Sequence, residues 1–436
     1  MGNRNSSYLL RASIFLITLF SFSCTFAQSE ERPKLKDFGS SLKRIKWDPD
    51  KKTAVETKSH SISQTASDDV DVVRVETSLV TSDLLVLDPH GQFVAGLTQD
   101  DFTVTEDGTP QQVGMFTLGD SVSVSRSIVL IIDYSSSQFP YIETSVAAAK
   151  TLIDKLTPVD RMAIVTDNVE LLQDFTKNKQ QLKDKLDSLL RRLKPGIMDS
   201  SSLRRFGRSQ QYSALMATLK EAFNNEDQRP IVIFQTDGDE LIFLRNPPVG
   251  LIPNSGPFPS DKRARDLMLK SIKAGQKEFS LEDICRAAEK SRATIYTVIP
   301  GFQVLGLSPD DQVKQLERKF AALTGSNESK AAHAYLSAMT PQMWRDWADR
   351  EMKIQAALAA VATSTGGWTM FLEKPADADH IYSSIFSDIN RRYIVGYYPT
   401  NKEHDGKRRK MNVEVRGHPD YVVVGRRWYY APAQDQ

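Results

Sequence analysis

The residues best suited to bind a ligand follow a short apolar run near position 130. Asp133, Ser135 and Ser137 alternate directly after residues 128–132, in the sequence Asp-Tyr-Ser-Ser-Ser. Carboxylate and hydroxyl oxygens are hard donors, the kind that Mg²⁺ binds in near-octahedral geometry. Hydroxyls two residues apart in an extended loop can face the same ion, while Asp133 supplies negative charge directly or through water. The spacing therefore indicates a divalent-metal site at the end of a strand.

Two further polar residues occupy comparable positions. Ser209 precedes a helical pattern at residues 212–223, and Asp237 follows the apolar run 231–234. Ligands of open α/β sheets collect beyond the carboxyl ends of the strands, so both side chains are expected at the same edge as Asp133. A simpler interpretation is that these side chains cap helices or satisfy loop amides. The candidate metal ligands are Asp133, Ser135, Ser137, Ser209 and Asp237.

The elements that position these residues alternate between strand and helix patterns over residues 125–391. Helical stripes such as Val146, Ala149 and Ile153 separate short apolar runs typical of buried strands. Such alternation predicts βαβ units and an α/β fold with a Rossmann-like, doubly wound, mostly parallel sheet. Two long polar stretches, 241–278 and 303–347, interrupt it and are expected to be insertions. The strand-like runs lie at 128–132, 162–165, 231–234, 294–299 and 368–372.

Strand patterns flank the α/β region on both sides. Alternating apolar residues and glycine-containing turns occupy residues 71–120 before it and 392–432 after it. We expect these N- and C-terminal strands to form one β-sandwich. Residues 28–70 are charged, rich in Ser and Thr, and without a sustained apolar period, which predicts a flexible tether.

Residues 1–27 have the pattern of a secretory signal peptide. Arg4 and Arg11 precede an apolar run at 14–26, and Ala27 ends a small-x-small cleavage pattern. The run is shorter than the roughly 20 residues of a spanning helix, so we expect no integral membrane span after cleavage. A retained anchor and a lipid on Cys24 are the alternatives. The expected location is the periplasm, the cell envelope or the extracellular space.

The composition excludes several classes of function. The chain has 56 basic and 55 acidic residues, and the leader contains two of the basic ones, so the remainder has a net charge of −1 and nothing favours a nucleic acid partner. Cys285 is then the one remaining cysteine, so no internal disulfide is expected. No histidine is placed to activate a serine, and no phosphate-binding loop is present. We therefore expect no enzymatic activity; a hydrolase with a metal-activated water is the less favoured alternative.

Several motifs resemble those of known proteins. Asp133-x-Ser135-x-Ser137, with a downstream hydroxyl and a second aspartate, Asp237, resembles the metal-ion-dependent adhesion site (MIDAS) of von Willebrand factor A-type (VWA) domains. The segment 94–108, VAGLTQDDFTVTEDG, resembles the acidobacterial VWFA-related family of exported bacterial proteins, as do YIVGYYP at 393–399 and WYYAP at 428–432. The resemblance extends from about residue 72 to residue 432.

The resemblance implies a role for each candidate residue. In A-type domains two serines and a threonine bind the metal, two aspartates act largely through water, and one coordination position stays open. The serine roles would fall on Ser135 and Ser137 and the aspartate roles on Asp133 and Asp237. The threonine role would fall on Ser209, where Gly-Arg-Ser replaces the usual Gly-Gly-Thr. The arginine would weaken cation binding by charge repulsion.

The function implied by this resemblance is a non-enzymatic protein-binding or adhesion module. It would use Mg²⁺, or Mn²⁺ or Ca²⁺, to bind an acidic side chain of a protein partner. The alternative is a metal-independent structural or assembly factor of the cell envelope with a degenerate MIDAS. Asp239 and Glu240, next to the second aspartate, are expected to be solvated loop charges.

Overall fold

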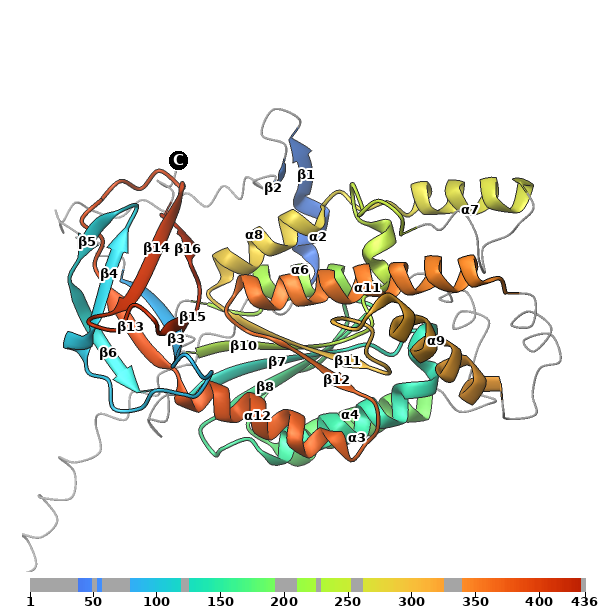
Figure 1. Ribbon diagram of the computed structural model, residues 1–436, viewed down its shortest axis with the longest axis horizontal. Helices are drawn as coiled ribbons and strands as arrows, with labels where there is room; N and C mark the ends of the chain where they lie inside the picture. Colours follow the sequence, from blue (N-terminus) through green and yellow to red (C-terminus); the bar gives the residue numbers. More distant parts are fainter. Residues whose placement is uncertain are drawn as a thin grey trace, which may run out of the picture. The chain divides into compact units, whose positions relative to one another are not determined.

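A computed structural model shows two regions of regular structure, an α/β domain and an antiparallel β-sandwich (Figure 1). The described residues are 38–48, 53–56, 79–118, 125–192, 210–224, 229–251, 262–324 and 339–432. Among them, no helix combines the length and apolar character that a membrane crossing requires.

The α/β domain is built on one six-stranded sheet in the order β12-β11-β10-β7-β8-β9. Every neighbouring pair is parallel except β8 and β9, which are antiparallel. All residues of β7, β10 and β11 are buried, as expected for strands covered on both faces. The strands are β7 (Arg126–Ile132), β8 (Arg161–Thr166), β9 (Leu171–Thr176), β10 (Arg229–Gln235), β11 (Thr294–Pro300) and β12 (Thr369–Leu372).

Helices cover both faces of this sheet, which confirms the expected doubly wound fold (Figure 1). One face is covered by α3 (Ile142–Asp154), α4 (Lys179–Arg192) and α12 (Asp377–Arg391). The opposite face is covered by α6 (Gln211–Glu221), α8 (Leu281–Ser291) and α11 (Pro341–Ser364). Two further helices, α7 (Lys262–Ala274) and α9 (Pro309–Thr324), lie within the two stretches expected to be insertions.

The β-sandwich combines strands from both ends of the chain, as expected. One sheet has the order β15-β3-β13-β6 and the other β16-β14-β4-β5. Tyr393 lies at the centre of their shared core, with its ring between those of Phe93 and Phe116 at centroid distances of 5.9 and 5.8 Å. The strands are β3 (Val80–Leu87), β4 (Phe102–Glu106), β5 (Thr109–Gln111), β6 (Val113–Leu118), β13 (Tyr393–Tyr397), β14 (Arg408–Val415), β15 (Val422–Val424) and β16 (Trp428–Tyr430).

The fold departs from the sequence expectations in two places. The stretch 28–70, expected to be a flexible tether, contains α2 (Ser40–Arg44) and the hairpin of β1 (Ile45–Asp48) and β2 (Thr53–Glu56). The Glu221 carboxylate accepts hydrogen bonds from the amides of Gly39 and Ser41 at 2.7 and 2.6 Å, which fixes this segment on α6. The stretch 303–347 includes the start of α11, whose later turns are buried against the domain.

A buried arginine joins the α/β domain to the sandwich. Arg392 follows α12, is 1% exposed, and its Nη2 lies 2.8 Å from Asp388 Oδ2. The same guanidinium donates to the carbonyl oxygen of Gly366 at 2.6 Å and to that of Asp83, in β3, at 3.3 Å. One side chain therefore connects a helix, the turn before β12 and a sandwich strand.

We predict that Gly367→Ala destabilises the protein by about 1–3 kcal/mol or more, because a rigid backbone leaves no room for a methyl group. A Cβ on Gly367 would overlap the carbonyl oxygen of Ile295. Gly114→Ala is the matched control, since its Cβ would meet only the Tyr398 ring at 3.4 Å. Urea unfolding of both variants measures the difference. Equal midpoints would show that the turn before β12 can move aside.

Candidate metal centre

Asp133 lies directly after β7, at the carboxyl edge of the sheet. Its amide donates to the carbonyl oxygen of Gln235 at 3.0 Å, which continues the β7–β10 ladder by one residue. The Asp133 side chain is 1% exposed, and its Oδ1 accepts the amide of Ser135 at 2.9 Å. This local hydrogen bond turns the chain away from the sheet. The two serines that follow are thereby placed above the buried carboxylate.

The two serine hydroxyls are close enough to share one ion. Ser135 Oγ and Ser137 Oγ are 3.1 Å apart, and the Ser137 side chain is exposed. Adjacent ligands of an octahedral Mg²⁺, each about 2.1 Å from the metal, are about 3 Å apart. The observed separation therefore fits two neighbouring positions in such an octahedron.

Asp237 follows β10 and completes the same cluster. Ser137 hydrogen-bonds to this carboxylate, and Gln138 Nε2 donates to its Oδ2 at 2.7 Å. Gln211 Nε2, at the start of α6, donates to Asp133 Oδ2 at 2.9 Å and lies 3.5 Å from Asp237 Oδ1. Four of the five candidate ligands thus come together. The fifth, Ser209, lies outside the described residues.

Several acidic side chains lie close together beneath the serines. Burial raises the pKa of Asp133, and burial together with the nearby charges of Asp239 and Asp133 raises the pKa of Asp237 well above its usual value. Asp167, which follows β8, has its pKa raised by burial and by Asp133. Each shift means that the surroundings disfavour the ionised carboxylate. A bound cation would offset that cost.

The donor set fits a hard cation. Within the described ranges, no group of three or more His, Cys, Asp or Glu side chains is placed to hold a metal ion. The donors that meet here are instead two hydroxyls and two carboxylates, all oxygen, as Mg²⁺ prefers. Gln138 Oε1, beside Asp237, is a buried amide oxygen without a hydrogen-bond partner among the described residues. When bound, a divalent ion would supply positive charge and a coordination position for a partner's oxygen.

The sequence interpretation missed some residues of the cluster and misjudged one. Asp167 could have been found, because it follows the parallel strand next to β7. Thr236 donates to Asp133 Oδ2 at 2.8 Å, and no sequence motif predicts this contact. Glu240, expected as a solvated loop charge, is 0% exposed. It accepts the Ser213 hydroxyl at 2.6 Å and lies 3.1 Å from Lys277 Nζ.

We predict that Gln211→Leu lowers the free energy of unfolding by about 2 kcal/mol or more, since buried polar groups lose their partners. Asp133 Oδ2 would lose one donor, and the Glu240 amide would lose its acceptor, Gln211 Oε1, at 3.1 Å. Gln181→Leu, at an exposed position of α4, is the control. Thermal unfolding in chelator measures both. An unchanged unfolding temperature in Gln211→Leu would show that the Gln211 amide does not stabilise the fold.

The comparisons with known proteins concern the fold. No family model matches the chain, and no curated protein sequence matches it. Similar solved structures include the conserved hypothetical protein BatB from Bacteroides thetaiotaomicron, at 13% identity and TM-score 0.32, covering 60% of this chain and 98% of that one. A von Willebrand factor type A protein from Catenulispora acidiphila matches at 10% identity and TM-score 0.33, covering 77% and 74%. The vWF domain of the type V pili tip protein Mfa5 from Porphyromonas gingivalis matches at 14% identity and TM-score 0.33, covering 62% and 97%.

The strand order of the sheet and the polar residues at its carboxyl edge agree with the sequence predictions. Five parallel strands with one antiparallel edge strand support loops that bring Asp133, Ser135 and Ser137 against Asp237. The α/β part of the chain therefore has the mostly parallel, doubly wound architecture that the sequence predicted, with these four residues at one edge of its sheet.

Proposed function

We propose that the chain is a non-enzymatic protein-binding module that uses a divalent cation, Mg²⁺ or alternatively Mn²⁺ or Ca²⁺, to hold an acidic side chain of its partner. The cation would be bound by Ser135 and Ser137, with Asp133 and Asp237 beneath them and Ser209 as a further ligand. The observation that carries the proposal is the hydroxyl pair 3.1 Å apart over buried carboxylates. An open coordination position beside Ser137 would receive the partner's carboxylate.

The surroundings of the serines favour binding over catalysis. The Ser135 hydroxyl is hydrogen-bonded to the Ser137 hydroxyl and to the Asp133 carboxylate, and no histidine contacts either serine among the described residues. A serine nucleophile is commonly activated by a histidine base. The exposed Phe139 ring, 59% accessible and two residues beyond Ser137, adds an apolar contact for a protein partner. We place the module outside the cytoplasm because of the leader pattern at residues 1–27.

Isothermal titration of Mg²⁺ and Mn²⁺ into the full chain tests the metal. Ser135→Ala with Ser137→Ala is the variant of choice, because it removes two partly exposed hydroxyls without emptying a buried position. Asp184→Ala, on the outer side of α4, is the control. Wild type and control should bind the ion, and the double variant should bind at least tenfold more weakly. Equal heats from all three proteins would exclude a metal at these serines.

The alternative is a structural or assembly factor of the cell envelope that binds its partner without metal. One observation favours it: amide groups of Gln138 and Gln211 already donate to Asp237 and Asp133. Capture of the partner from an envelope extract, with and without chelator, separates the two functions. Chelator abolishes capture by the metal-dependent module and leaves capture by the structural factor unchanged.

A further inference from the structure

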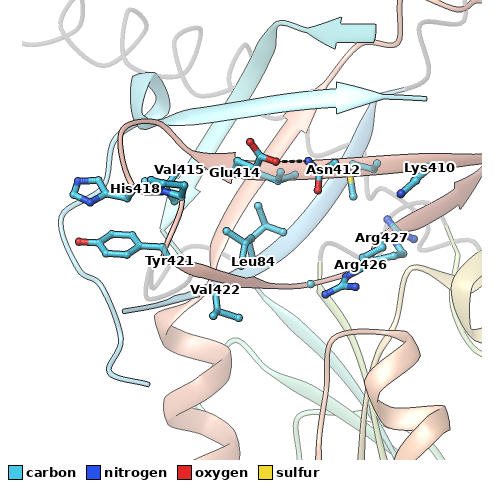
Figure 2. Close-up of a pocket in the computed structure, with 15 residues that line it drawn as sticks. Leu84, Lys410, Asn412, Glu414, Val415, His418, Tyr421, Val422, Arg426 and Arg427 are labelled. Atoms are coloured by element: carbon cyan, nitrogen blue, oxygen red, sulfur yellow. Dashed lines mark hydrogen bonds between the residues drawn. The ribbon is translucent and has the colours of Figure 1, made fainter. Parts of the chain in front are cut away.

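A groove separates two consecutive strands of the sandwich, β14 and β15. They are joined by the short turn 416–421 but belong to different sheets, β14 beside β4 and β15 beside β3. The groove between them has a volume of about 480 Å³ and is lined by residues of both strands, by Leu84, which lies between them, and by Arg426 and Arg427 (Figure 2). An ordinary hairpin would have closed this gap by pairing the two strands.

The β15 side of the groove is a free strand edge. Antiparallel strands direct the backbone groups of alternate residues to opposite sides. In β3, Val86 O accepts the amide of Val94, away from β15, so Val86 and its partner Val423 do not bond to each other. The N–H and C=O of Val423 therefore point away from β3, into the groove.

The β14 side is also a free edge. The Met411 amide donates to Arg427 O at 2.9 Å, on the side of β16, while the Lys410 amide bonds to Asp107 on the side of β4. By the same alternation, the N–H and C=O of Val413 point to the β16 side. However, β16 pairs only with residues 408–410 of β14. No backbone partner of Val413 on that side occurs among the described residues.

The two ends of the groove differ in charge. His418 and Tyr421 stack at one end with ring centroids 4.3 Å apart, and Lys410, Arg426 and Arg427 lie at the other (Figure 2). Lys410 and Arg427 are exposed, and neither has an ion pair within the described ranges. The Arg426 guanidinium donates to the carbonyl oxygens of Thr81 and Glu289, at 2.6 and 3.3 Å, and not to a carboxylate. This end therefore carries three basic side chains, of which Arg426 also interacts electrostatically with Asp83 and Glu289, while Glu414 lies between the two ends of the groove.

We propose that this groove binds an extended segment of another polypeptide, which adds as a strand between β14 and β15 and places acidic residues at the Lys410 and Arg427 end. Addition of a strand would satisfy Val413 and Val423 together and join the two sheets along this side. Val413 of β14 and Val423 of β15, both partly buried beside the groove, offer apolar contacts to side chains of the guest. This site is separate from the proposed metal centre and does not depend on it.

A pair of substitutions at Val423 tests the main-chain contact. Val423→Pro removes an N–H that points away from β3, so the β3–β15 ladder is kept, and Val423→Thr is the control that keeps the N–H. The probe is a fluorescent six-residue peptide of alternating Val and Thr with Asp-Glu at one end or the other. Fluorescence anisotropy with the full chain should show binding by wild type and Val423→Thr, and about tenfold weaker binding, 1.4 kcal/mol, by Val423→Pro.

Two further probes keep the result independent of how well the proline variant folds. Peptides N-methylated at alternate amides should lose binding to wild type in one of the two registers only. A peptide in which Lys-Lys replaces Asp-Glu should not bind the wild type. The same peptide should bind the variants Arg427→Glu and Lys410→Glu. Failure of wild type to bind any acidic probe, or equal binding of both methylated peptides, would overturn the proposal. So would protection of Val413 and Val423 from hydrogen exchange in the free protein, which would assign the groove to this chain's own residues.

Discussion

Millimolar Mg²⁺ is expected to raise the unfolding temperature of the wild-type protein and to leave that of Asp237→Asn unchanged. A ligand that binds only the folded state stabilises it by about 2.7 kcal/mol when present at a hundred times its Kd. Replacing the carboxylate removes its charge and one of the oxygens that would face the proposed metal, while keeping an acceptor for Gln138. Differential scanning calorimetry with Mg²⁺ and with chelator measures the effect.

The pH dependence of the same experiment has a definite sign. Burial, Asp239 and Asp133 raise the pKa of Asp237 in the folded state well above its usual value. Its contribution to stability is then fully present below the unfolded pKa of about 3.9 and is lost as the pH rises through the folded value. In chelator, wild type should therefore lose stability towards neutral pH relative to Asp237→Asn. A gain in Mg²⁺ that is equal in both proteins would place the ion elsewhere.

Arg392→Met is expected to destabilise the protein by about 3–5 kcal/mol, because it leaves a buried carboxylate without its cation. Asp388 is 7% exposed, and its Oδ2 accepts hydrogen bonds from Arg392, Tyr296 and Trp368. Two carbonyl oxygens, of Gly366 and Asp83, would also lose a donor. The midpoint of urea unfolding measures the loss.

Arg391→Met is the matched control for this substitution. Arg391 is the exposed neighbour, and its guanidinium lies over the Phe93 ring at 5.8 Å. Its loss should cost well under half as much as the loss of Arg392. Similar midpoints for the two variants would show that the fold does not depend on the contact between Arg392 and Asp388. If Arg392→Met is destabilised as expected, adding Asp388→Asn should recover part of the lost stability.

The sequence predicted those parts of the fold that depend on local pattern. Fully buried parallel strands are continuous apolar runs, so β7, β10 and β11 were evident within two residues of their ends. The edge strand β9, Leu171–Thr176, was not predicted, because Gln173 and Asp174 interrupt its apolar residues. The segment around α2 was assigned to a tether because its contacts are with distant residues, among them the carboxylates of Glu221 and Asp283.

The candidate site was predictable in part for a related reason. Asp133 and Asp237 each follow a strand. Once a parallel sheet is predicted, the carboxyl ends of its strands are expected at one edge, so the two side chains are expected to lie close together. The amides of Gln138 and Gln211 were not predictable, because glutamine at a helix start has no characteristic spacing to a carboxylate 78 residues away. Ser209 stays a prediction, since it lies outside the described residues.

The interleaving of the sandwich strands has a consequence for biogenesis. Tyr429, in β16, donates to Glu106 at 2.6 Å across 323 residues of chain, and β13 lies between β3 and β6. The α/β domain uses only the chain between these strands, so it can form while β14 to β16 are still being synthesised. The sandwich cannot close until those last strands arrive, and pairings of such long range form slowly. During that interval the unpaired edges of β3 and β4 are the surfaces that a chaperone would need to protect.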